Sequence, residues 1–100
     1  MRWLWTWGGK FFGYRLADNL YTYQGKHVGR FTGSEVFGAD GLYVGEIRGT
    51  DRLVSDKTKA SFRKPPFAPE YPRSPIDARP DAAEYTMYGD IDDFRSPESF

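Results

Sequence analysis

The sequence predicts an all-β protein, an antiparallel meander of about seven short strands followed by a proline-rich, extended C-terminal tail. Two observations lead to this prediction. Glycines recur in pairs at an interval of sixteen residues, in GKFFGYR, GKHVGRF and GLYVGEI. All seven prolines lie beyond residue 64, whereas nine of the eleven glycines lie between residues 8 and 45. Because glycine permits tight turns and proline interrupts sheet hydrogen bonding, the chain divides into a β-hairpin repeat domain, residues 1–56, and a charged tail, residues 57–100.

Three aligned units of sixteen residues begin at Leu4, Leu20 and Val36, and a truncated fourth begins at Arg52. Each unit predicts a β-hairpin, because the dipeptides Gly-Gly, Gln-Gly and Asp-Gly precede the second strand and Asp-Gly is a strong signal for a two-residue turn. The first glycine of each pair would form the turn, and the second would clear space or bend the strand. These glycines are Gly9, Gly13, Gly25, Gly29, Gly41 and Gly45.

A two-residue turn would pair Trp5 with Phe12 and bring apolar side chains of all units onto one face. The candidates for the core or a subunit interface are Trp3, Trp5, Trp7, Phe12, Tyr21, Val28, Phe37, Val44 and Leu53. A three-residue turn with a bulge is the alternative, and it would shift this register. In either case the meander has two apolar faces, and a sheet of this size cannot cover both. The tail or other copies of the chain must cover one of them, and we favour a homo-oligomer because closed symmetric assemblies are common.

The composition excludes several classes of protein. Fourteen basic and fourteen acidic side chains give a formal net charge of zero, which does not indicate a globally basic nucleic-acid-binding protein. The chain has no cysteine, which removes thiolate nucleophiles and cysteine-ligated zinc and fits a reducing compartment. No stretch approaches the roughly 18 apolar residues of a membrane span. We therefore expect a soluble cytoplasmic protein with no membrane partner.

The tail contains residues suited to partner binding. In its first part, basic and aromatic side chains alternate in a way that can engage a phosphate backbone and stack on a base. The candidates are Lys57, Lys59, Phe62, Arg63, Lys64, Phe67 and Tyr71. Residues 57–79 hold six basic and two acidic side chains, and residues 80–100 hold one basic and six acidic ones, so the two halves would attract each other and shield the basic run. A short helix near residues 81–88 is the alternative to extended chain there.

No catalytic constellation is recognisable, and we predict a non-enzymatic protein without a metal or cofactor. His27 is the only histidine and stands in the unit position of Phe11 and Tyr43, so we interpret it as filling an aromatic slot. The acidic run at residues 90–93 lacks the spacing of a calcium loop. An active site would need several chains to meet at a symmetry axis, where the candidates are Arg15, Arg30, Glu46 and Arg48.

The segments WTWGGKFFGY, LYTYQGKHVGRF, EVFGADGLYVGEI and DRLVSD resemble the four-fold beta flower proteins, a small bacterial family, over about residues 3–56. The resemblance implies an all-β module with a four-fold arrangement and no established activity, and it favours a tetramer. Either four chains or four internal units would supply that symmetry. The tail lies outside the resemblance, so nothing is implied about it.

Three hypotheses for function follow, in order of preference. The first is a non-enzymatic, oligomeric β module whose tail mediates self-assembly or binds a protein partner. The second is a nucleic-acid-binding protein that uses the basic and aromatic residues of segment 57–64. The third is a small ligand-binding protein or enzyme with its site at a subunit interface.

Overall fold

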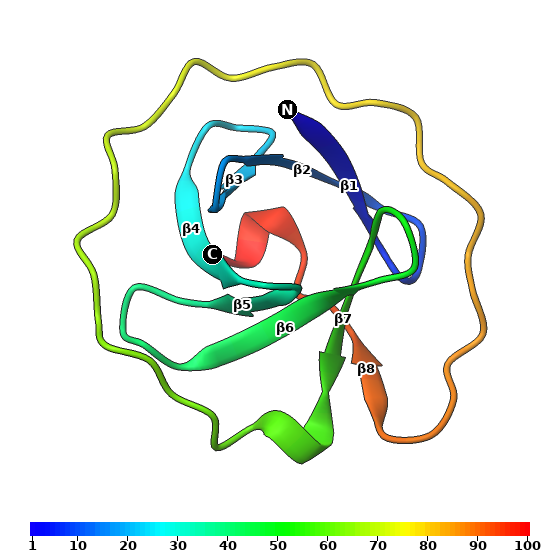
Figure 1. Ribbon diagram of the computed structural model, residues 1–100. Coiled ribbons are helices and arrows are strands. Elements are labelled where there is room, and N and C mark those ends of the chain that lie inside the picture. The colour runs from blue at the N-terminus through cyan, green and yellow to red at the C-terminus, as the bar shows by residue number, and fades with distance from the viewer.

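The computed structural model describes residues 1–100 and is almost entirely β-structure (Figure 1). Eight strands follow chain order in one sheet, which closes because β1 also pairs with β7 in the parallel direction. The elements are β1 (Arg2–Thr6), β2 (Phe11–Leu16), β3 (Asn19–Thr22), β4 (His27–Thr32), β5 (Glu35–Phe37), β6 (Tyr43–Arg48), β7 (Arg52–Asp56), the 3₁₀ helix η1 (Lys57–Lys59), β8 (Ile91–Asp93) and the 3₁₀ helix η2 (Pro97–Ser99). The all-β fold and the antiparallel meander are confirmed. The closure of strands β1–β7 into a barrel, with β8 added beside β7, was not predicted.

A β-bulge determines which side chains of the first hairpin point into the barrel. Leu4 pairs with Gly13, whereas the next residue, Trp5, pairs with Phe11, so Phe12 is an extra residue in β2. Phe12 consequently lies with Leu4 in the core, and Trp5 points outward. The prediction that Trp5 and Phe12 share a face is therefore wrong. It assumed a regular hairpin with a two-residue turn, in which Trp5 would pair with Phe12, whereas the bulge makes Trp5 pair with Phe11.

The other two hairpins have the same bulge. Tyr21 pairs with His27, and Phe37 pairs with Tyr43, in each case next to a register shift. The inward-facing residues form one cluster inside the barrel: Leu4, Phe12, Leu20, Val28, Phe31, Val36, Ile47, Leu53 and Phe94, with Val44 and Phe100 packed against it. Tyr21 and Phe37 are buried too, but on the outer face, so their predicted grouping with Val28 and Val44 is also wrong.

Leu53 belongs to the inward-facing set with Leu4, Leu20 and Val36. The sixteen-residue repeat predicts Arg52 in that position. The turn before β7 has three residues between paired positions, whereas the turns before β3 and β5 have two, and this extra residue moves the fourth unit by one position.

The last residues of the chain fill the interior of the barrel. After β8 the chain turns into the lumen, where the short helix η2 and the C-terminus lie at the centre of the ring of strands (Figure 1). The ring of Phe94 contacts the ring of Phe12 edge-on at 5.2 Å, and the ring of Phe100 does the same at 5.6 Å. We call residues 94–100 the plug.

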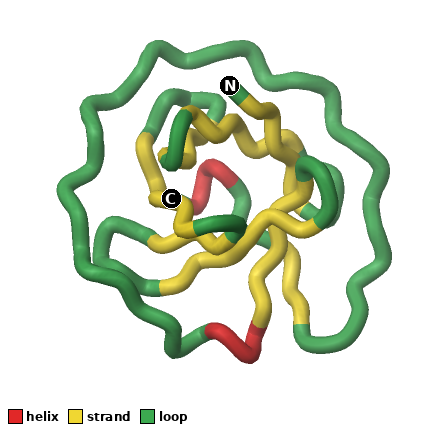
Figure 2. The backbone as a smooth tube through the Cα atoms, viewed as in Figure 1, coloured by secondary structure: helices red, strands yellow, loops and turns green.

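Residues 60–90, which we call the strap, circle the outside of the barrel (Figure 2). About 30 residues of extended chain at about 3.1 Å per residue reach about 90 Å, the circumference of a ring about 30 Å across. That diameter fits the 35 × 33 × 21 Å extents of the molecule. One chain thus covers both faces of its own sheet, the inner face with the plug and the outer face with the strap.

The helix considered near residues 81–88 does not form. The carboxylate of Asp81 accepts the backbone N–H of Phe11 at 3.2 Å instead of capping a helix. The backbone N–H groups of Ala82 and Tyr85 donate to carbonyl oxygens of the barrel, at 2.8 and 3.1 Å. These tertiary hydrogen bonds take the donors that a helix would need.

Candidate functional site

The strap binds the turns of the three hairpins in the same way. It passes the third hairpin first, then the second, and then the first. At each turn a strap N–H donates to the carbonyl of the turn glycine; the pairs are Lys64 to Gly41 at 2.8 Å, Arg73 to Gly25 at 2.9 Å and Ala82 to Gly9 at 2.8 Å. Three residues later a second N–H donates to the barrel; these pairs are Phe67 to Ala39 at 3.0 Å, Ile76 to Tyr23 at 2.8 Å and Tyr85 to Trp7 at 3.1 Å. The strap donors recur every nine residues and the barrel acceptors every sixteen. Nine residues of strap therefore match one hairpin.

The paired glycines allow two close backbone approaches. The turn glycines Gly9, Gly25 and Gly41 have φ of +98°, +93° and +84°, and a Cβ on any of them would overlap a backbone carbonyl of the strap. A Cβ on the second glycine of a pair would instead crowd a carbonyl of the next unit; the pairs are Gly13 with Tyr21, Gly29 with Phe37 and Gly45 with Val54. The first glycine thus makes room for the strap, and the second makes room for the neighbouring strand.

The N-terminal tryptophans lie half-buried beneath the strap. The indole N–H of Trp5 donates to the carbonyl of Pro80 at 3.0 Å, and that of Trp7 donates to Thr86 at 3.1 Å. The guanidinium of Arg79 covers the ring of Trp3 at 4.1 Å. These residues hold the strap in place within one chain.

Arg52 is a buried anchor that sequence reasoning missed. The residue is 5 % exposed, and its Nη1 donates to the carbonyl of Ala83 at 2.7 Å and to that of Trp7 at 3.3 Å. Its guanidinium also lies 4.0 Å from the centre of the Tyr85 ring. A single arginine therefore joins β7, the first hairpin and the strap, and no local sequence signal marks it.

His27 fastens the strap to the second hairpin. The residue is 4 % exposed, and its ring contacts the rings of Tyr21 and Phe67, at 5.1 and 5.3 Å between centres. Its Nδ1 accepts the N–H of Glu70 at 2.8 Å, and its Nε2 lies 2.9 Å from the carbonyl oxygen of Gly29. This pair of partners requires a neutral ring with its hydrogen on Nε2, because a proton on Nδ1 would face the N–H of Glu70.

We expect the protein to lose stability when His27 is protonated. Burial lowers the pKa of His27 below its ordinary value of 6.5; the Gly29 carbonyl and Glu70 oppose the shift, and Arg30 adds to it. Because the folded chain binds this proton less readily than the unfolded chain, the free energy of unfolding should be fully retained above about pH 6.5. It should then fall as the pH drops from there towards the folded pKa. Urea unfolding between about pH 7.5 and 5.5 measures the slope, in a range where histidine is the side chain that ordinarily titrates.

The control is His27→Phe, which introduces the residue that the first hairpin has in this position. The chain has one histidine, so the slope should be absent in this variant. The same slope in the wild type and in His27→Phe would contradict the assignment.

Glu46 is the centre of a buried polar network on the outer face. Its carboxylate accepts hydrogen bonds from Tyr43 Oη at 2.9 Å, Lys59 Nζ at 2.8 Å and Arg48 Nη2 at 3.0 Å. Burial would raise the pKa of Glu46, but these donors outweigh it and lower the pKa. Burial also raises the pKa of the Tyr43 hydroxyl. Each member is satisfied by another, an arrangement that rigidifies a fold.

The residues predicted to bind a partner do not form one surface. Lys59 pairs with Glu35 and Glu46, both at 2.8 Å, and Lys57 pairs with Asp92 at 3.5 Å. Carboxylates of the same chain thus neutralise two of the four cations in segment 57–64.

The other predicted tail residues have different environments. Phe67 packs against His27 with the two rings tilted, Nζ of Lys64 lies 5.8 Å from the centre of the Phe37 ring, and Phe62 is 44 % exposed beside Tyr43. Arg63 forms a β-bridge with Leu42. Tyr71 is 92 % exposed.

The four residues considered for an intersubunit site are not gathered in one place. Arg48 and Glu46 are paired at 3.0 Å. Arg15 pairs with Asp18 at 3.1 Å, and Arg30 pairs with Glu70 at 3.6 Å. The structure also contains no group of three or more His, Asp or Glu side chains placed to hold a metal ion.

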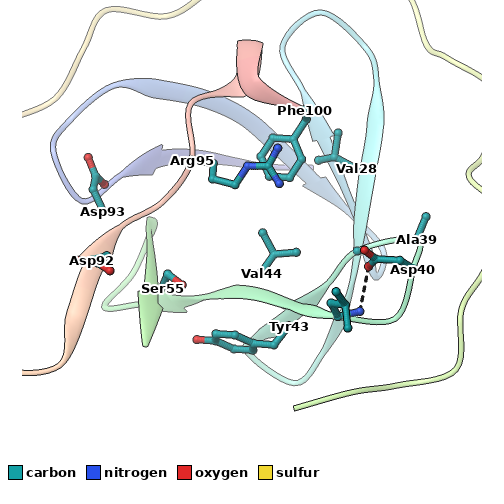
Figure 3. Close-up of a pocket in the computed structure, with 12 residues that line it drawn as sticks. Val28, Ala39, Asp40, Tyr43, Val44, Ser55, Asp92, Asp93, Arg95 and Phe100 are labelled. Atoms are coloured by element: carbon teal, nitrogen blue, oxygen red, sulfur yellow. Dashed lines mark hydrogen bonds between the residues drawn. The ribbon is translucent and has the colours of Figure 1, made fainter. Parts of the chain in front are cut away.

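A cavity of about 640 Å³ opens at one end of the barrel, beside the turn of the β5–β6 hairpin (Figure 3). Val28, Val44 and Phe100 lie around its inner part, and Arg95 extends across the ring of Phe100 (Figure 3). The carboxylates of Asp40, Asp92 and Asp93 lie at its edge. We call this cavity the mouth.

The chain matches no protein-family model, no curated protein and no solved structure. None of its helices has the length and apolar character needed to cross a membrane.

Proposed function

We propose that this protein is a non-enzymatic interaction module: a barrel held by its own strap, which associates with other copies through the outer side of that strap. One observation carries the proposal. Apart from Met1, every large hydrophobic side chain that is exposed belongs to the strap; these are Phe62, Tyr71, Tyr85, Met87 and Tyr88. Tyrosine is enriched at protein interfaces, and exposed aromatics on extended chain are typical anchors for grooves.

The arrangement of polar groups supports a role in binding rather than catalysis. Every buried side-chain nitrogen and oxygen has a hydrogen-bond partner within the chain. The two groups whose pKa is raised most, Tyr43 and Lys59, belong to the Glu46 network. Tyr43 lines the mouth, but its hydroxyl already donates to Glu46 and accepts the N–H of Asp56. Because such groups are already paired, they are better suited to holding the strap than to moving protons.

We interpret the fold as three hairpin repeats and a fourth hairpin, β7–β8, whose turn is replaced by the strap. The inward position of Leu53 and the contact of Gly45 with Val54 support this interpretation. Four internal hairpins would supply the four-fold arrangement that the beta flower resemblance implies. The absence of cysteine is consistent with the further proposal that the protein works in the cytoplasm.

Self-association is tested by light scattering of the full chain over a range of concentrations. We expect a mass above the 11.5 kDa of one chain that rises with the protein concentration. Tyr71→Lys and Met87→Lys should shift the mass towards 11.5 kDa, because each places a charge on an apolar contact.

Thr50→Lys is the matched control, since it adds the same charge to an exposed turn outside the strap. All three variants should keep the wild-type stability within about 0.5 kcal/mol. A mass of 11.5 kDa at every concentration would contradict self-association, and the strap would then be available only to a different partner.

A further inference from the structure

The plug leaves one part of the barrel interior unfilled. The mouth, at about 640 Å³, lies where the β5–β6 turn, β8 and Phe100 surround the end of the lumen (Figure 3). Small-molecule sites usually have volumes of about 300–1,000 Å³, and the mouths of β-barrels are a frequent location for them. The mouth lies apart from the exposed side chains of the strap, so this inference is independent of the proposed self-association.

The inner part of the mouth is apolar. Val28 faces the lumen from β4, and Val44 and Phe100 pack against the core but remain partly exposed. A hydrocarbon or aryl group of a ligand could be buried against these side chains and so be removed from contact with water. Burial of this kind favours binding by about 25 cal/mol for each Å² of apolar surface.

The edge of the mouth is acidic, with three carboxylates and one guanidinium. The guanidinium of Arg95 is already used by the plug, since it donates to the carbonyl of Ser99 at 2.6 Å and covers the ring of Phe100 at 4.0 Å. Asp93 accepts the N–H of Gly8 through Oδ1, and Asp40 accepts that of Leu42 through Oδ1. Oδ1 of Asp93 also accepts the N–H of Phe94, so this carboxylate is used by the fold, whereas no hydrogen bond within the chain uses Oδ2 of Asp40.

Asp92 is the third carboxylate, and its partner is on the surface. It pairs with Lys57 at 3.5 Å, and both side chains are more than half exposed. An exposed pair of this kind is weak and exchanges readily with a competing cation.

We propose that the mouth binds a small amphipathic organic cation, with its hydrocarbon or aryl body against Val28, Val44 and Phe100 and its ammonium group beside Asp40, while Asp92 adds negative charge from the opposite side of the opening (Figure 3). The charge of the edge selects the cation, and the apolar inner part selects its body. Neither feature suits an inorganic ion, which would leave the valine side chains exposed, or an anion, which would meet an excess of carboxylates.

The experiment titrates the full chain with phenethylammonium and follows the methyl groups of Val28 and Val44 by NMR. We expect saturable shifts of both residues with this cation, weaker binding of 2-phenylethanol and no saturation with 3-phenylpropanoate. Asp40→Asn and Asp92→Asn should each weaken binding by about two- to five-fold, the contribution of an exposed ion pair. Asp18→Asn, which removes an exposed carboxylate outside the mouth, should leave the affinity unchanged.

Val44→Phe is a second variant, chosen to fill the mouth while the barrel stays folded. It should abolish the shift of Val28 without lowering the midpoint of thermal unfolding. The proposal is overturned if Val28 and Val44 show no saturable shift in the wild type, or if 3-phenylpropanoate binds as tightly as the cation. It is also overturned if Asp40→Asn and Asp92→Asn behave like Asp18→Asn.

Discussion

Gly25→Ala is expected to detach the strap from the second hairpin and to lower the free energy of unfolding by about 2–5 kcal/mol. Part of the loss comes from the backbone, because φ at this residue is +93° and a Cβ raises the energy of that conformation. The rest comes from overlap of the new Cβ with the backbone of Arg73. Urea unfolding measures the total, and hydrogen exchange of the Arg73 and Ile76 amides, which donate to Gly25 and Tyr23, measures the detachment.

Gly49→Ala separates the two contributions. Gly49 also has positive φ, at +72°, but a Cβ there would meet nothing within 4 Å. This variant should therefore show the backbone cost alone, with the Arg73 amide still protected. If Gly25→Ala and Gly49→Ala lose the same stability and both keep that protection, then the strap does not approach the turn as closely as described.

Phe12→Ala is expected to lower the free energy of unfolding by about 3–5 kcal/mol, the usual cost of truncating a buried phenylalanine. Phe12 has no exposed surface and meets both Phe94 and Phe100 edge-on. Its removal leaves a cavity beneath the plug, so the plug should become mobile. Exchange of the Ser99 amide, which donates to the carbonyl of Ser96 at 3.0 Å, should accelerate together with the loss of stability.

Phe62→Ala is the matched control, because it makes the same truncation at a residue of the strap that is 44 % exposed. Its effect should be under about 1 kcal/mol, and the Ser99 amide should exchange as in the wild type. Similar losses of stability for Phe12→Ala and Phe62→Ala would mean that Phe12 is not the inward residue of the bulge.

The sixteen-residue glycine spacing was sufficient to predict the hairpins and the antiparallel meander. Turn chemistry is local: Asp40-Gly41 and its equivalents favour a tight turn wherever the rest of the chain lies. The alternation of Trp3, Trp5 and Trp7 on one side of the first strand also follows from the two-residue period of an extended chain. These features depend on neighbours in sequence, so the sequence determined them by itself.

The register between the bulge and the turn could not be predicted, because one extra residue moves the side chains of that stretch to the opposite face, so that Trp5 pairs with Phe11 instead of Phe12. The bulge at Phe12 has no residue signature that distinguishes it from a regular turn. The choice between the two registers depends on whether Trp5 or Phe12 is better buried. That in turn depends on what covers each face of the barrel.

Only the tertiary structure decided what covers those faces. The nine-residue spacing of Phe67, Ile76 and Tyr85 is present in the sequence. It can be interpreted only once the structure places these residues beside hairpin turns that recur every sixteen residues, where their N–H groups find acceptors. Proline removes the local hydrogen bonds that would mark the strap as an element, so its conformation is set by donors and acceptors on the distant barrel. The local turns therefore determined the strands, and contacts between residues far apart in the chain decided the barrel closure, the strap and the plug.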